Sequence, residues 1–208
     1  HRGPCIVKPV DGSGSAGVKI VADAAAMLDW AAHERVDCDA QPRLVVEEFV
    51  DAPLLSVDGL VADGRLLVAM VSTYTETCYA SLASLVPHGV LQLDPRDPRA
   101  KAALGYVDRL LSAMPCPHAP PRFPAALFEH GDRGLLLCEI ACRTGGGRIR
   151  DIARMTLGVD LDQWAALGQS GTDPARLLPA PRRSTRLMGD VLFPNPGRTL
   201  FCAPAHSP

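Results

Sequence analysis

Residues 137–149 read LCEIACRTGGGRI and join an apolar strand to a glycine-rich turn. Glu139 interrupts the apolar strand pattern, and a buried carboxylate is costly unless it is paired or binds a metal. The glycines Gly145–Gly147 allow a close approach of the backbone to a ligand, while Arg143 and Arg148 supply guanidinium groups that bind anions. A polar turn is the simpler interpretation of each feature alone, but their combination favours a binding site.

A second segment, residues 5–21, has a short apolar strand that ends in Lys8 and a loop of small residues, DGSGSAG, at 11–17. Phosphate binding needs a cation and accessible backbone N–H groups, which Gly and Ser provide. The loop lacks the Gly-Lys-Ser/Thr of a P-loop and the glycine spacing of a dinucleotide fingerprint. A second extended run, residues 18–21, predicts a β-hairpin, and an ordinary hairpin tip is an equal alternative for the loop.

A third segment, VVEEFV at residues 45–50, is a buried-strand pattern that ends in two carboxylates and an apolar pair. Such a segment can offer backbone groups to a purine edge and apolar walls to the ring. Taken alone, a strand end whose acids face water is the favoured interpretation.

The remaining pattern alternates hairpins with helices and predicts an α+β architecture with mainly antiparallel sheets. Asp63-Gly64 between apolar runs predicts one hairpin, and residues 125–140 predict another. The helices are expected from Asp23 to about Val36, from Asp97 to Pro115 with Asp97 as N-cap, from Ile149 to Leu157 with Gly158 after it, and after Asp160. A last pair of strands is expected within 185–193 and 199–202.

Composition limits the classes of partner. The 208 residues are 47% hydrophobic, with a formal net charge of −2, which argues against nucleic acid or an anionic membrane as partner. The apolar runs are too short to span a bilayer, and no signal peptide is expected at the start. The seven cysteines have irregular spacing without a zinc pattern, so reduced thiols in the cytoplasm are expected.

The order of these three segments resembles the ATP-grasp superfamily, most closely its carboxylate–amine ligases such as the dipeptide-forming amino-acid ligases. The resemblance covers about residues 4–200. It implies an ATP-grasp fold of two α/β subdomains with nucleotide bound between them, a lid at 1–48 and a C-terminal core at 49–208. It also implies that an N-terminal α/β portion precedes His1.

The resemblance assigns roles residue by residue. Lys8 and Arg143 would be catalytic, Lys8 on the nucleotide phosphates and Arg143 on the transferred phosphate or acyl phosphate. Glu139 would bind Mg²⁺. Gly145, Gly146, Arg148 and again Arg143 would hold the substrate. The remaining nucleotide contacts would come from the phosphate loop and the adenine hinge: Gly12, Ser13, Gly14, Ser15, Gly17, Glu47, Glu48, Phe49 and Val50.

Several positions depart from the family pattern. Ala141 and Ala126 stand where relatives carry further metal ligands, and Pro53-Leu54-Leu55 stands where many carry a ribose-binding Glu. Glu129 and Asp58 could replace a ligand, although a structural or solvated role is the favoured interpretation of both.

The implied function is an ATP- and Mg²⁺-dependent ligase that joins a small-molecule carboxylate to an amine through an acyl phosphate, with a homodimer as a possible assembly. One alternative is a degenerate domain that binds nucleotide without catalysis, and another is an interaction domain without a nucleotide site. No general base is identifiable, because His88 and His118 lie in proline-rich segments and are interpreted as surface residues.

Overall fold

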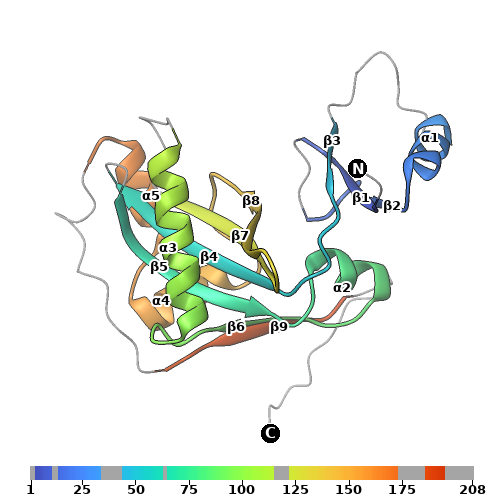
Figure 1. The fold of residues 1–208 in the computed structure, drawn as a ribbon. Helices are drawn as coiled ribbons and strands as arrows, with labels where there is room; N and C mark the ends of the chain where they lie inside the picture. The colour runs from blue at the N-terminus through green and yellow to red at the C-terminus, as the bar shows by residue number, and fades with distance from the viewer. Residues whose placement is uncertain are drawn as a thin grey trace, which may run out of the picture.

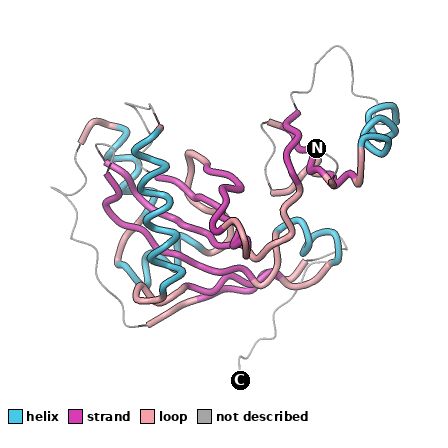
Figure 2. The backbone as a smooth tube through the Cα atoms, viewed as in Figure 1, coloured by secondary structure: helices cyan, strands magenta, loops and turns pink. Residues whose placement is uncertain are grey.

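Two antiparallel sheets organise the chain (Figures 1 and 2). The computed structural model describes residues 3–10, 14–33, 44–62, 65–114, 122–172 and 186–194. A three-stranded sheet has the order β2-β1-β3, and a six-stranded sheet has the order β8-β7-β4-β5-β6-β9. Every pairing in these ranges is antiparallel, which confirms the predicted α+β class.

The small sheet contains β1 (Cys5–Pro9), β2 (Lys19–Val21) and β3 (Leu44–Glu48). The predicted hairpin is confirmed, since β1 pairs with β2. Its turn needs glycine at Gly17, which has a φ of 71° and would bring a Cβ into contact with Pro9. The buried pattern expected for β3 is wrong: Val46 is 54% exposed, because β3 is an edge strand of this small sheet.

Helix α1 (Ala24–His33) follows β2. Asp23 Oδ1 accepts a hydrogen bond from the Ala26 N–H at 2.8 Å, which confirms the predicted N-terminal cap. The predicted helix end near Val36 lies outside the described residues.

The large sheet is built on two long hairpins, as predicted. They are β4 (Leu54–Ala62) with β5 (Arg65–Tyr74), and β7 (Arg122–His130) with β8 (Gly134–Ile140). Helix α2 (Cys78–Ser84) and strand β6 (His88–Gln92) are additional to the predicted elements. Strand β9 (Gly189–Leu192) pairs with β6; the strand expected at 199–202 lies outside the described residues.

One face of the large sheet packs against α3 (Pro98–Ala113), which crosses the sheet in Figure 1. Leu55 and Val57 project from the same face of β4. They pack in one cluster with Ala103 and Val107 of the helix, and all four side chains are buried. The predicted start of this helix is confirmed, since Asp97 accepts a hydrogen bond from Arg99 N–H at 2.8 Å.

The opposite face packs against α4 (Ile149–Leu157) and α5 (Leu161–Gln169). Leu60 and Met70 meet Ile152 and Trp164 in a second apolar cluster. Gly158 ends α4 in the left-handed conformation with a φ of 67°, as predicted. Among the helices described, none is long and apolar enough to cross a membrane.

Asp97→Ala should lower the free energy of unfolding by about 1 kcal/mol, because the first turn of α3 loses its side-chain cap. Urea denaturation followed by circular dichroism measures the change. Lys101→Ala, at an exposed position of the same helix, is the control. Equal losses in the two variants would contradict the capping role.

Candidate functional site

A polar row crosses the six-stranded sheet on the face that α4 and α5 cover. Cross-strand partners project to the same face of a sheet. Glu139 of β8 lies opposite Ala126, Ala126 lies opposite Ser56, and the row continues through Ser72 to Gln92. Gln92 Nε2 donates to Thr156 Oγ1 of α4 at 3.3 Å, which identifies the face.

Asp58 lies on the same face, two residues beyond Ser56 along β4. It is 2% exposed, and Ser56 Oγ donates to its Oδ2 at 2.5 Å. Burial raises the pKa of Asp58 to about 6, against the opposing effects of the Ser56 hydrogen bond and the Arg143 charge. Its Oδ1 has no hydrogen-bond partner among the described residues. A Cβ at Gly145 would overlap this oxygen, so the glycine-rich segment lies directly against the carboxylate.

Tyr74 lies close to the Asp58 carboxylate, and Cys78 lies close to Glu139. Tyr74 shares a hydrogen bond with Ser56, and burial raises the pKa of Tyr74 to about 12. Burial also raises the pKa of the Cys78 thiol, with a further contribution from the negative charge of Glu139. The side chains from β4, β5, α2 and β8 therefore share one electrostatic environment.

The three-stranded sheet presents Lys8 toward this environment. Lys8 Nζ lies 2.7 Å from Glu47 Oε2. Partial burial disfavours the ammonium, but the Glu47 hydrogen bond and charge, with smaller contributions that include Glu139, raise the pKa of Lys8 overall. Lys8 thus lies within the electrostatic field of Glu139, which belongs to the other sheet.

Glu139 is expected from the sequence to be buried, but its side chain is exposed. The register between β7 and β8 shifts after Ala126, so Cys138 has no cross-strand partner. Such bulges re-aim side chains and are frequent beside active sites. The shifted register puts Glu139 on the same face as Ala126 and Ser56, where its carboxylate is exposed and not buried as predicted.

Glu47 and Glu48, the two acids of the predicted adenine hinge, face opposite ways, as expected for successive residues of a strand. Glu47 shares its face with Lys8, while Glu48 lies opposite Cys5. Arg133 Nη1, in the turn between β7 and β8, donates to both oxygens of Glu48 at 2.9 Å. Phe49 N–H donates to the Pro4 carbonyl at 3.1 Å, and both Phe49 and Val50 are half-buried.

A double-mutant cycle of Glu48→Ala and Arg133→Ala should give a coupling energy of about 0.2–1 kcal/mol in denaturant unfolding. The reason is that both side chains are nearly half exposed, so solvent screens the pair. A coupling energy of several kcal/mol would contradict the interpretation of Glu48 and Arg133 as a weak, solvent-screened ion pair between the two sheets.

Polar contacts fix the glycine-rich segment, residues 143–148, to helices α4 and α5. Thr144 Oγ1 donates to Asp162 Oδ1 of α5 at 2.6 Å, and Arg143 Nη1 donates to the Thr144 carbonyl at 3.1 Å. Arg148 Nε lies 2.6 Å from Asp151 Oδ2, at the start of α4. Gly146 would meet no atom within 4 Å if it carried a Cβ, so its outer side is open.

The residues predicted to form a phosphate-binding loop are only partly within the described chain. Gly14 and Ser15 form the turn with φ values of 59° and 60°, followed by Gly17. Gly12 and Ser13 lie outside the described residues.

Comparisons with known proteins give structural matches alone. The sequence matches no family model and no curated protein. An L-amino acid ligase from Bacillus licheniformis aligns with a TM-score of 0.57 at 20% identity, over 78% of this chain and 38% of that one. N5-carboxyaminoimidazole synthetase from Staphylococcus aureus, complexed with ADP, aligns with a TM-score of 0.61 at 13% identity, over 92% and 46%.

A third match has the same extent. The biotin carboxylase domain of a Hydrogenobacter thermophilus 2-oxoglutarate carboxylase, in complex with MgADP, ADP and bicarbonate, aligns with a TM-score of 0.57 at 15% identity, over 82% of this chain and 37% of that one. The chain has the ATP-grasp fold. It spans less than half the length of each of these three ATP-grasp chains.

A magnesium site would need several oxygen ligands close to Glu139. The described ranges contain no cluster of three metal-ligating side chains. Ala126 lies directly opposite Glu139, and Glu129 is 3.7 Å from Arg99. The described residues therefore do not form a metal site by themselves; Glu139 supplies one exposed carboxylate, and Mg²⁺ can take its other ligands from phosphates and water.

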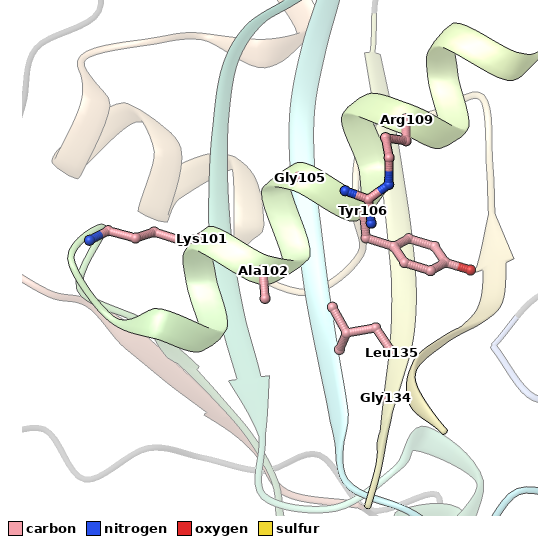
Figure 3. A pocket seen from close by; sticks show the side chains of 7 residues that line it. All are labelled: Lys101, Ala102, Gly105, Tyr106, Arg109, Gly134 and Leu135. Atoms are coloured by element: carbon pink, nitrogen blue, oxygen red, sulfur yellow. The ribbon is translucent and has the colours of Figure 1, made fainter. Parts of the chain in front are cut away.

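A cavity of about 630 Å³ lies elsewhere on the molecule, between α3 and the start of β8 (Figure 3). Its lining comes from Lys101, Ala102, Gly105, Tyr106, Arg109, Gly134 and Leu135. Helix α3 packs on the face opposite to α4 and α5, so the sheet separates this cavity from Asp58.

Several site residues escape sequence reasoning. Tyr74, Cys78 and Asp190 carry no local signal, because cross-strand register and the placement of α2 bring them to this face. Asp58 does carry one, since a charged residue within an apolar strand indicates a constrained carboxylate.

Proposed function

We propose that the chain is the nucleotide-binding part of an ATP-dependent carboxylate–amine ligase, with a lid at 1–48 and a core at 49–208. The observation that carries the proposal is the position of Lys8, which is bound to Glu47 on the small sheet and lies in the field of Glu139 on the large one. A cation between two sheets of this fold is suited to the phosphates of a nucleotide.

The nucleotide would occupy the space on the Lys8 side of the small sheet. Lys8 would exchange its contact with Glu47 for phosphate oxygens, which frees the Glu47 carboxylate to accept a hydrogen bond from a purine amino group. Glu48 remains bound to Arg133 in this assignment. Phe49 and Val50 would flank the ring, and the loop of Gly12, Ser13, Gly14, Ser15 and Gly17 would cover the phosphates.

The acyl substrate would lie at the glycine-rich segment. Backbone groups at Gly145 and Gly146, together with the Arg148 guanidinium, would hold its carboxylate. Arg143 would stabilise the charge that develops on the transferred phosphoryl group. When bound, Mg²⁺ would neutralise phosphate charge beside Glu139.

The reaction begins when the substrate carboxylate oxygen attacks the γ-phosphorus of ATP and releases ADP. The amine nitrogen then attacks the carbonyl carbon of the acyl phosphate. A C–N bond forms, the C–O bond to phosphate breaks, and inorganic phosphate leaves.

We expect the protein to work in the reducing cytoplasm. The four described cysteines have free thiols, which is consistent with that compartment: Cys5, Cys78, Cys138 and Cys142.

A second candidate function has its own supporting observation. Ala126 directly opposite Glu139 leaves one carboxylate where two would bridge a metal. A domain that binds nucleotide with little Mg²⁺ dependence and without turnover fits this reduced metal site.

One assay distinguishes the two functions. The protein containing this chain is incubated with ATP, Mg²⁺ and hydroxylamine, with each of the twenty common amino acids as the carboxylate. The ligase should release ADP and phosphate together and form a hydroxamate from the trapped acyl phosphate. The absence of hydroxamate with every carboxylate, alongside Mg²⁺-independent ATP binding, would overturn the ligase in favour of the binding domain.

A further inference from the structure

Buried polar atoms without partners gather on the site face of the large sheet. Buried polar groups are normally hydrogen-bonded, so such a cluster indicates a ligand. Among the described residues, the unpartnered side-chain atoms on this face are Asp58 Oδ1, Ser72 Oγ, His88 Nδ1 and both carboxylate oxygens of Asp190. The Asp190 and His88 atoms have no role in the function proposed above.

Asp190 reaches this face from the last described strand. It lies opposite Val90 of β6, which in turn lies opposite Tyr74 of β5. Its Oδ2 would be 3.6 Å from a Cβ at Gly147, so the carboxylate adjoins the glycine-rich segment. His88 and Arg148 both lie close enough to act on the Asp190 carboxylate, but Arg148 is bound to Asp151.

His88 stands at the start of β6, and it is partly buried rather than at the surface as predicted. Its ring packs against Tyr74, with centroids 4.9 Å apart and an interplanar angle of 58°. Its Nε2 lies 3.8 Å from Cys78 Sγ. A neutral imidazole with its proton on Nε2 leaves the buried Nδ1 as a proton acceptor.

We propose that Asp190 and His88 receive the ammonium group of the amine substrate, with Asp190 binding the cation and His88 Nδ1 accepting its proton. This inference rests on the proposed ligase function. Burial raises the pKa of Asp190, against the opposing effects of His88 and Arg148, and a bound ammonium would stabilise the ionised carboxylate.

An ammonium nitrogen has no lone pair, so it must lose a proton before it attacks. His88 takes that proton and becomes imidazolium beside the Asp190 carboxylate. The freed lone pair forms the C–N bond as the acyl phosphate loses phosphate, and the second nitrogen proton leaves with the phosphate.

A comparison of two nucleophiles, hydroxylamine and an amino acid, distinguishes this proton transfer from the rest of the reaction. Hydroxylamine is uncharged at neutral pH and needs no base, whereas an amino acid arrives as an ammonium. Asp190→Asn and His88→Asn should each lower amide formation with the twenty amino acids, supplied singly as the amine, by about 100-fold, the range of general-base catalysis. Hydroxamate formation should stay within about threefold of the wild-type rate. Asp132→Asn and His130→Asn, in and beside the β7–β8 turn, are the matched controls.

The outcomes distinguish the two levels of the proposal. Retained hydroxamate formation with lost amide formation supports the inference. A parallel loss of both products in the His88 and Asp190 variants indicates a structural role and overturns the inference alone, as does retention of both. A wild-type protein that forms no hydroxamate overturns the ligase function and this inference with it.

Discussion

Arg143→Met should lower kcat for ADP release by about 100-fold or more, with little change in the free energy of unfolding. Removal of one group that stabilises developing charge typically costs about 3–4 kcal/mol of transition-state stabilisation. The Arg143 side chain is exposed, but its charge acts on Asp58 and Cys78, so the guanidinium lies over the polar face. Its one described hydrogen bond is to the neighbouring Thr144 carbonyl, which leaves further donors for a phosphoryl group.

Steady-state kinetics with ATP and carboxylate measures this loss, and Arg150→Met is the matched control. Arg150 is also an exposed arginine near the glycine-rich segment, but it is bound to Asp162 of α5 at 3.1 Å. Its removal should change kcat by less than about threefold. Equal losses in the two variants would show that general positive charge, rather than the position of Arg143, supports the reaction.

Asp58→Asn should stabilise the fold by up to about 3 kcal/mol at pH 7. Burial raises the pKa of Asp58 from 3.8 to about 6, so the folded protein binds a proton more tightly than the unfolded chain. Each unit of pKa corresponds to about 1.4 kcal/mol. The wild type is therefore destabilised by Asp58 ionisation as the pH rises from about 4 to about 6, and this cost is constant above that window.

Urea denaturation between pH 4 and pH 7 tests this expectation. The difference in unfolding free energy between the Asn variant and the wild type should grow across the window from 4 to 6. Asp108→Asn, at an exposed position on α3, should show no such growth. A variant that is less stable than the wild type at pH 7 would show that the ionised carboxylate is stabilised by more than Ser56 and Arg143.

Local patterns predicted the hairpins and the long helices because their signals are contained in a few adjacent residues. Asp97-Pro98 begins α3 and Gly158 ends α4, as their chemistry dictates. Helix α2 escaped prediction since it is only seven residues long and ends at Leu85 in the left-handed region, where glycine is usual. Strand β6 is defined by its partners β5 and β9, which no local pattern encodes.

Some residues of the candidate site were likewise predictable from local sequence, and others depend on strand register. Sequence predicted Lys8 and Glu139 because each stands near the end of a recognisable strand, and it predicted the three glycines because they form an unusual run. The sequence did not distinguish the roles of Glu47 and Glu48. Strand register does, since it places Glu47 beside Lys8 and Glu48 on the other face. It also gathers Asp58, His88 and Asp190 from strands far apart in the chain, and a bulge puts Glu139 on the same face as Ala126.

We expect nucleotide to bind on the Lys8 side of the small sheet. Isothermal titration with ADP and Mg²⁺ should give a Kd that weakens about tenfold or more in Lys8→Met, since a hydrogen bond to a charged group contributes about 1.5–3 kcal/mol. Lys19 lies on the opposite face of the same sheet, across from Val7, so Lys19→Met should bind as the wild type does. Equal binding by both variants, or no binding by the wild type, would contradict the account.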